Sequence, residues 1–194
     1  MPEVPAPDTL AGALDRAAGL LSAGARDRRG AAHAPTLATI GLDGRPRLRT
    51  VVLRALDMDA RTLRFHADAR GDKVAEMAAD TRVALHVYDA GEKLQVRVEG
   101  RATLHRDGAV ADEAWAGSRR ISRVCYATQP APGAVIAAGD AYRLPEEGEV
   151  EAGRANFVAV TVRIGSIETL SLAFAGHRRA LFRFDPDEAF WLVP

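Results

Sequence analysis

The stretch that decides the fold is Arg45-Pro46-Arg47-Leu48-Arg49-Thr50-Val51-Val52-Leu53-Arg54. Its alternation of basic and apolar residues, followed by two valines, is typical of a β-strand with two different faces. A turn-forming pair, Asp43-Gly44, stands between this stretch and an apolar run at 36–40. The pattern predicts two strands, at 36–40 and 47–53, joined by a tight hairpin. Antiparallel sheet is therefore expected.

The same stretch opens a window of positive charge. Residues 45–73 hold eight basic side chains against four acidic ones, in a chain whose 26 basic and 26 acidic residues cancel. The basic residues are Arg45, Arg47, Arg49, Arg54, Arg61, Arg64, Arg70 and Lys73. Arg47 and Arg49 share one face of their strand, and a helix is expected to begin near Asp72. If Arg70 and Lys73 meet that face, guanidinium, ammonium and helix-start amide groups could together hold a phosphate.

Two interpretations of this window stay open. Gly71 favours a phosphate site, because a residue without a side chain lets the backbone approach an anion closely. Asp72 counts against it, because a carboxylate in the first helical turn competes for the same amides. The arginines could equally coat an exposed face of the barrel without binding a ligand.

Composition excludes several classes of protein. With 194 residues, 47% of them hydrophobic, the chain is expected to form one core. Its cancelling charges give no global field for nucleic acid or an anionic membrane. The N-terminus carries Glu3 and Asp8, and no uncharged apolar run reaches the roughly 18 residues of a membrane span. The single cysteine, Cys125, agrees with a cytoplasmic location, and the five histidines lack metal-ligand spacing, so no metal is expected.

The rest of the chain predicts more strands with helices between them. Residues 1–30 are expected to form an N-terminal helical segment, with a helix at 9–23 capped by Asp8. Residues 31–194 are expected to form a single sheet domain. Strands are expected at 62–67, 83–88, 94–104, 157–164 with an extension toward 172, 180–184 and 190–193. A helix should follow Asp107-Gly108, and 128–153 should form a long loop with one short helix near Val135. About seven or eight strands predict a mainly β (α+β) fold, a closed or nearly closed antiparallel barrel with flanking helices.

Three spaced motifs carry a resemblance to a known family. They are Arg49-Thr50-Val51-Val52-Leu53-Arg54, the helix-start Lys73, and Gln95 within Leu94-Gln95-Val96-Arg97-Val98-Glu99-Gly100. Together they resemble the pyridoxamine 5'-phosphate oxidase-like, FMN-binding split-barrel family, over roughly residues 30–194. The resemblance implies an antiparallel split β-barrel, FMN as cofactor, and a homodimer with two FMN sites at the subunit interface.

The resemblance also implies which residues bind FMN. They are Arg49, Thr50, Val51, Val52, Leu53, Arg54, His66, Ala67, Arg70, Gly71, Lys73, Gln95, Gln129 and, in the basic turn near His177, Arg178. Arg49 would contact the phosphate, and Gln95 the edge of the flavin ring, where its amide can donate and accept. Gln129 would reach the cofactor of the partner subunit. The sequence departs from the family pattern at the pair His66-Ala67, where an aromatic residue and a threonine are expected, at Pro130, and at Leu170, where a tryptophan is expected.

The substrate side departs further from the family. Arg54, Arg119 and Ser122, with Trp115 in place of a tyrosine, match the positions that hold a substrate phosphate. The Arg-x-His spacing that handles the pyridoxal ring is replaced by His177-Arg178-Arg179-Ala180-Leu181. The resemblance implies an oxidoreductase that transfers a hydride from a small, possibly phosphorylated substrate to FMN, with no acid or base of its own assigned. The alternative is a flavin- or haem-binding carrier, sensor or stress protein without turnover. Cys125 as a nucleophile is disfavoured, because no base adjoins it.

Overall fold

The computed structural model describes residues 6–194, so Glu3 lies outside the described part. The helices are α1 (Leu10–Arg26), α2 (Asp72–Ala79), α3 (Ala109–Ala116) and α4 (Arg120–Ala127), with 3₁₀ helices η1 (Ala31–His33) and η2 (Glu147–Asn156). The strands are β1 (Thr36–Ile40), β2 (Pro46–Thr50), β3 (Leu53–Asp57), β4 (Thr62–Asp68), β5 (Arg82–Asp89), β6 (Leu94–His105), β7 (Phe157–Ser171), β8 (Arg178–Phe184) and β9 (Asp187–Leu192). Within residues 6–194, no helix is long and apolar enough to cross a bilayer.

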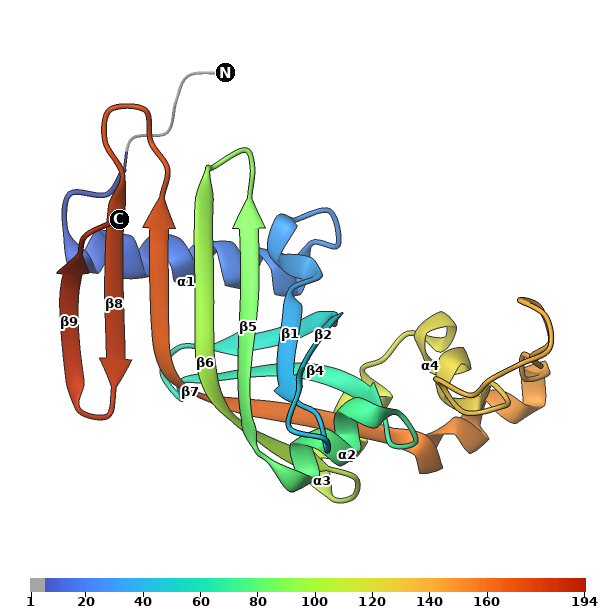
Figure 1. The fold of residues 1–194 in the computed structure, drawn as a ribbon. Coiled ribbons are helices and arrows are strands. Elements are labelled where there is room, and N and C mark those ends of the chain that lie inside the picture. Colours follow the sequence, from blue (N-terminus) through green and yellow to red (C-terminus); the bar gives the residue numbers. More distant parts are fainter. Residues whose placement is uncertain (1–5) are drawn as a thin grey trace.

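The nine strands of residues 6–194 form one sheet that curls back on itself (Figure 1). The order along the sheet is β2-β1-β5-β6-β7-β4-β3, and β8 pairs with β7 and β9. The two ends of that order, β2 and β3, are joined by only Val51 and Val52. A linker of two residues holds the ends of the sheet together, so the sheet must curve into a barrel. The antiparallel barrel with flanking helices predicted from the sequence is confirmed.

The barrel splits along β7. One edge of β7 pairs with β6 along nearly its whole length. On the other edge, β4 pairs with residues 157–163, whereas β8 pairs with residues 166–171. The change of partner falls at Ile164 and Gly165, opposite a register shift in β6 between Glu99 and Gly100. Beyond this point β8 and β9 form a separate flap of the sheet.

The core fills the inside of the curl. Buried side chains from alternating strand positions include Leu37, Phe65, Leu85, Val98 and Ile167. Helix α1, which runs across the strands in Figure 1, adds Ala13, Ala17 and Leu21 to the same cluster. A second, smaller cluster of Ala114, Trp115, Tyr126, Phe157 and Ala159 lies where α3 and α4 meet the start of β7.

Several sequence expectations about elements are wrong in detail. The single strand expected at 47–53 is two strands, because the chain changes its pairing partner from β1 to β4 after Thr50. The helix expected near Val135 is absent, and the segment ends instead in η2. Helix α1 begins after Thr9, whose hydroxyl caps Gly12 N at 3.1 Å, and not after Asp8.

Helix α4 is missing from the sequence expectations. Its stability comes from tertiary contacts, since Arg123 donates to Trp115 O at 2.8 Å and Tyr126 is buried in the smaller cluster. Such contacts leave no local signal in the sequence. Together with residues 128–146 and η2, α4 forms an arm that projects from the barrel (Figure 1).

The crossing of β6 and β7 requires a glycine at position 100. A Cβ placed there would lie 2.2 Å from Arg163 O and 2.8 Å from Val162 Cγ1. We expect Gly100→Ala to lower the free energy of unfolding by about 3 kcal/mol. The added methyl group would collide with a backbone carbonyl, which cannot move aside as a flexible side chain could. The matched control is Gly19→Ala on the exposed side of α1, where nothing lies within 4 Å. In the control, the free energy of unfolding should rise by up to about 1 kcal/mol, because alanine has the higher helix propensity. Urea unfolding measures both, and equal midpoints for the two variants would contradict the close approach.

Candidate functional site

Arg49 points from β2 toward α2 and is held there by a buried carboxylate. Its Nη2 lies 2.5 Å from Glu76 Oε2, and its Nη1 donates to Thr39 Oγ1. Thr39 in turn donates to Glu76 Oε2 at 2.6 Å. Glu76 is only 4% exposed, so its charge is compensated chiefly by Arg49. The three residues fasten α2 to the β1–β2 hairpin and fix the direction of the Arg49 guanidinium.

Lys73 lies in the first turn of α2, one turn before Glu76 and on the same side of the helix. Within residues 6–194, the Lys73 ammonium group makes no hydrogen bond or ion pair. The helix begins after Gly71, and a Cβ there would lie 3.6 Å from Lys73 Nζ and 3.4 Å from Asp68 O. The first-turn amides of a helix have no intrahelical acceptor. The start of α2 is therefore a small cradle of donor groups and positive charge, with Asp72 as the one carboxylate in its first turn.

Arg70 is committed to the protein itself. Its guanidinium lies 2.6 Å from Asp68 Oδ2 and donates to the carbonyl groups of Tyr126 at 3.1 Å and Thr128 at 3.0 Å. The hydrogen bonds to Asp68 raise the pKa of Arg70 above its usual value. Arg70 thus joins the turn between β4 and α2 to the end of α4. It brings Gln129, the residue after Thr128, to the same side of the barrel as the cradle.

His66 is the most perturbed titratable group of the site. Its ring meets Phe157 edge to face, with centroids 4.8 Å apart. In the part of the chain that the structure describes, its buried Nε2 has no hydrogen-bond partner. Burial, with the positive charges of Arg54 and Arg64, lowers the pKa of His66 from 6.5 to about 3. The imidazole is therefore neutral at physiological pH.

Of the residues predicted to hold a substrate, Arg54 lies near His66. Arg54, in β3, is exposed and makes no hydrogen bond or ion pair with any of residues 6–194, although its charge acts on His66 and on Tyr126 of α4. Arg119 and Ser122 stand together at the start of α4, where Ser122 N donates to Arg119 O at 2.8 Å. Burial raises the pKa of the Tyr126 phenol. The structure thus places Arg54 and α4 near the same aromatic cluster.

Two other predicted cofactor residues lie on the outer face of the sheet. Gln95 stands between Tyr88 and Leu170 in the register of β5, β6 and β7. Thr50 lies on the same face. It stands opposite Thr36, and Thr36 stands opposite His86, which shares a face of β5 with Tyr88 two residues further on. Arg178 begins β8 opposite Ser171, at the far end of the flap. One subunit therefore does not gather Arg178 with the cradle.

The remaining predicted residues line the closure of the barrel. Val51 and Leu53 are buried, and Val51 N donates to Pro35 O at 3.0 Å. Val52 is half-buried between them, and Ala67 is buried next to His66. Sequence reasoning missed Glu76 and Asp68, the two buried carboxylates that hold Arg49 and Arg70. Glu76 could have been noticed as an acidic residue between Val74 and Met77 on the apolar side of α2.

The split barrel defines the class of this protein, and comparison with known proteins gives its family. The family model described as pyridoxamine 5'-phosphate oxidase matches residues 23–168. The chain therefore belongs to the pyridoxamine 5'-phosphate oxidase family, as its motifs predicted.

Relatives in sequence carry one name. A pyridoxine/pyridoxamine 5'-phosphate oxidase of Methylibium petroleiphilum is 30% identical over 82% of this chain and 66% of its own length. One from Thermosynechococcus vestitus is 38% identical over 46% of this chain. That match covers only 40% of the Thermosynechococcus enzyme's own length. The matches to the enzymes of Cupriavidus pinatubonensis and Rubrobacter xylanophilus cover 32% and 31% of their lengths.

Two solved structures share the whole fold. A pyridoxamine 5'-phosphate oxidase-related, FMN binding protein of Nostoc punctiforme has a TM-score of 0.66 with 22% identity, over 95% of each chain. PhzG of Burkholderia lata, solved with tetrahydrophenazine-1-carboxylic acid, has a TM-score of 0.70 with 20% identity, over 97% of this chain and 94% of its own. At these identities the likeness concerns the fold alone.

The neutral state of His66 predicts an acid-dependent loss of stability. Because the folded pKa of about 3 lies below the ordinary 6.5, the unfolded chain takes up this proton first as pH falls below about 6.5. Stability is therefore lost between pH 6.5 and about 3. We expect His66→Gln to reduce the loss between pH 7 and pH 4.5 by up to about 2 kcal/mol. Urea unfolding at several pH values measures it.

The exposed His86 of β5 supplies the matched control for this experiment. His86→Gln should keep the wild-type pH dependence. If His66→Gln also keeps it, the His66 imidazole is not held neutral by the fold.

Proposed function

We propose that this protein binds FMN and works as an FMN-dependent oxidoreductase on a small, phosphorylated substrate. The observation that carries the proposal is the cradle at the start of α2. It combines an ammonium group that has no partner among residues 6–194, a glycine just before the helix, and first-turn amides. These groups suit the phosphate of a nucleotide cofactor better than any neutral ligand. Family membership supports the same choice.

The residues of this chain would then bind and orient the cofactor. Lys73 and the α2 amides would hold the phosphate. Arg49 would approach it from β2, in a direction fixed by Glu76. The backbone around Val51 and Val52, with the Gln95 amide, would meet the flavin ring. Bound FMN would supply a hydride acceptor, and the protein would supply position and electrostatics.

We further propose a homodimer in which Gln129 reaches the partner's cofactor. The projecting arm supports this arrangement, because it carries large apolar side chains that the single chain leaves uncovered. They are Ile121, Val135, Ile136, Tyr142 and Leu144. Exposed apolar patches of this kind mark interaction surfaces. A second subunit packed on the outer sheet face would also bring Arg178 of one chain toward the cofactor of the other.

The substrate would bind between Arg54 and the start of α4. Arg54 carries a charge that no carboxylate of residues 6–194 compensates by direct contact. Arg119 and Ser122 lie one helical turn apart at the start of α4 and offer further hydrogen-bond donors. A phosphate group on the substrate would suit these donors. Pyridoxamine 5'-phosphate or pyridoxine 5'-phosphate is the best single choice, in keeping with the names of the sequence relatives.

Cofactor binding is tested by titrating the apoprotein with FMN and following flavin fluorescence. Lys73→Gln should weaken FMN binding at least ten-fold, because a charge-assisted hydrogen bond is lost (roughly 1.5–3 kcal/mol). Lys73 is a cleaner target than Arg49, whose replacement would also leave the buried Glu76 unpaired. The matched control is Arg106→Gln, an exposed cation on the loop after β6. Equal affinities of Lys73→Gln and wild type would place the phosphate elsewhere.

Turnover is tested on the FMN-loaded protein under anaerobic conditions. Added pyridoxamine 5'-phosphate should bleach the flavin absorbance, and admission of air should restore it with release of hydrogen peroxide. Tight FMN binding without bleaching would favour a flavin carrier or sensor. A Soret band in the purified protein, in place of flavin bands, would favour a haem-binding protein.

A further inference from the structure

The charged side chains that hold and flank the start of α2 cancel one another. They are the cations Arg49, Arg70 and Lys73 and the carboxylates Asp68, Asp72 and Glu76. His66, two residues before Asp68 on β4, adds no charge, because its imidazole is neutral at physiological pH. A site of net positive charge would attract a doubly charged phosphate, whereas this group is neutral as a whole. The affinity for a phosphate therefore depends on which of these charges the fold has already paired.

Arg70 and Arg49 are both paired within the fold. Arg70 Nε donates to Asp68 Oδ1 at 2.9 Å and Arg70 Nη2 to Asp68 Oδ2 at 2.6 Å, and both terminal nitrogens also donate to backbone carbonyls. Every guanidinium nitrogen of Arg70 thus already has an acceptor. Arg49 contacts Glu76 Oε2, and only 21% of the Arg49 side chain is exposed. A phosphate can therefore reach Arg49 only in competition with Glu76.

Asp72 differs from the other two carboxylates because it is unpaired. It is exposed in the first turn of α2, next to Lys73, and makes no hydrogen bond or ion pair within residues 6–194. The helix gains some stability from a negative charge at its start. A phosphate bound to the first-turn amides would be repelled by the same charge.

Glu76 opposes a phosphate from the inside of the fold. Its side chain is 4% exposed and lies one turn after Lys73 on the same side of α2. A buried charge is screened less by water than an exposed one, so its repulsion acts more strongly. Glu76 also engages the Arg49 guanidinium, which would otherwise suit a phosphate through forked hydrogen bonds. Glu76 therefore lowers the affinity for a phosphate both by repulsion and by pairing with Arg49.

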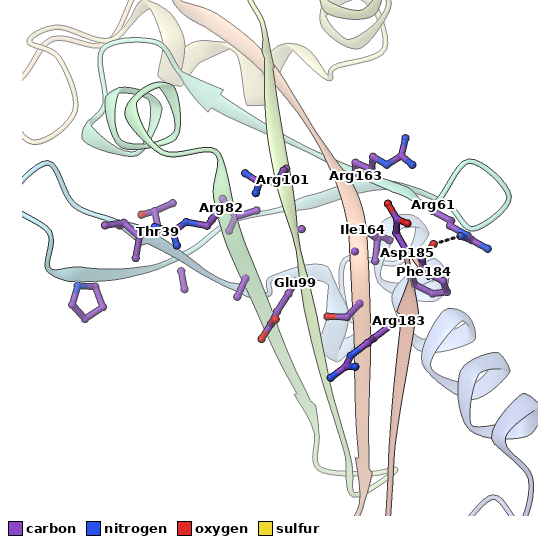
Figure 2. A pocket seen from close by; sticks show the side chains of 18 residues that line it. Thr39, Arg61, Arg82, Glu99, Arg101, Arg163, Ile164, Arg183, Phe184 and Asp185 are labelled. Atoms are coloured by element: carbon purple, nitrogen blue, oxygen red, sulfur yellow. Dashed lines mark hydrogen bonds between the residues drawn. The ribbon is translucent and has the colours of Figure 1, made fainter. Parts of the chain in front are cut away.

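The arginines of the outer sheet face do not replace these cations. Arg82, Arg101 and Arg163 are neighbours in the register of β5, β6 and β7. Arg82 is paired with Asp80 at 2.6 Å, and Figure 2 shows the side chains of Arg101 and Arg163 pointing away from each other. These guanidinium groups therefore do not converge on one phosphate. Of the cations around α2, Lys73 is the one that meets a phosphate without a paired carboxylate as competitor.

We propose that the protein holds its flavin as an exchangeable ligand, because Asp72 and Glu76 oppose the phosphate of the cofactor. This inference rests on the FMN site proposed above. The two carboxylates lower the affinity chiefly by speeding dissociation, as most changes of affinity within one site do. The loaded fraction of the protein then follows the concentration of free FMN. Contacts to the flavin ring do not depend on either carboxylate.

The test compares FMN with riboflavin, which is the same flavin without the phosphate. The purified full-length protein is freed of flavin and titrated with each ligand, and flavin fluorescence reports binding. Asp72→Asn should tighten FMN binding by about five-fold or more, because a negative charge beside the phosphate is removed. The same variant should bind riboflavin as wild type does. The matched control is Asp59→Asn, an exposed carboxylate in the turn at the other end of β4, which should change neither affinity.

Exchange is measured on the FMN-loaded protein after transfer into flavin-free buffer. Wild type should lose most of its FMN during dialysis, and Asp72→Asn should release FMN more slowly by about five-fold or more. Added salt should reduce the difference between the two proteins, since it screens exposed charges. A merely structural role of Asp72 at the helix start predicts a lower melting temperature with unchanged FMN release.

Glu76→Gln provides a second variant, on the buried side of the helix. It leaves Arg49 without a carboxylate, so the flavin-free variant should melt below wild type. FMN should raise its melting temperature by more than it raises that of wild type, because the phosphate takes the place of Glu76 beside Arg49. Riboflavin should raise the melting temperatures of both proteins equally.

Three results would overturn the proposal. In the first, Asp72→Asn binds and releases FMN as wild type does, although Lys73→Gln binds FMN more weakly. That result would leave the FMN site in place and refute the opposing role of the carboxylate. In the second, wild type keeps its full content of FMN through prolonged dialysis. In the third, neither flavin binds to wild type or to any variant, which would overturn the proposed FMN site as well.

Discussion

The close crossing of β6 and β7 is the constraint on which the rest of the structure depends. The two strands are paired from Leu94 with Ser171 to His105 with Ala159, and β5, β4 and β8, which pair with them, connect the remaining strands to this pair. β5 continues the sheet from β6 toward the β1–β2 hairpin, while β7 changes its partner from β4 to β8. The close approach of β6 and β7 requires Gly100, because a side chain at this position would collide with the carbonyl oxygen of Arg163. The barrel splits at the level of that approach.

A second constraint positions the start of α2. Helix α2 is short, and a helix of eight residues has little stability of its own. It is held at its start by the turn that Arg70 fastens to α4, and in its middle by the buried pair of Glu76 and Arg49. Breaking a buried pair leaves an uncompensated charge, which is far more costly than losing a surface pair. Arg49 and Arg70 are thus paired with carboxylates that hold the helix in place, whereas Lys73 has no hydrogen-bond or ion-pair partner among residues 6–194.

The two basic regions of the barrel differ in how their charges are balanced. Around α2, buried carboxylates compensate Arg49 and Arg70, and Lys73 has no partner within the described residues 6–194. On the outer sheet face, the row of Arg82, Arg101 and Arg163 has one carboxylate for three guanidinium groups.

The sequence by itself determined the barrel, the family and the identity of Lys73 as the helix-start cation. Strand alternation and the Asp43-Gly44 turn act over a few residues, so they are legible without the fold. Tertiary structure alone decided that Arg49 and Arg70 are held by Glu76 and Asp68, that α4 is a helix, and that residues 47–53 are divided between two strands. It also decided that Arg82, Arg101 and Arg163 form a row. These features depend on contacts between distant segments and on the strand register. A shift of the register by one residue would move every side chain of a strand to the other face of the sheet, so no local pattern could show these features.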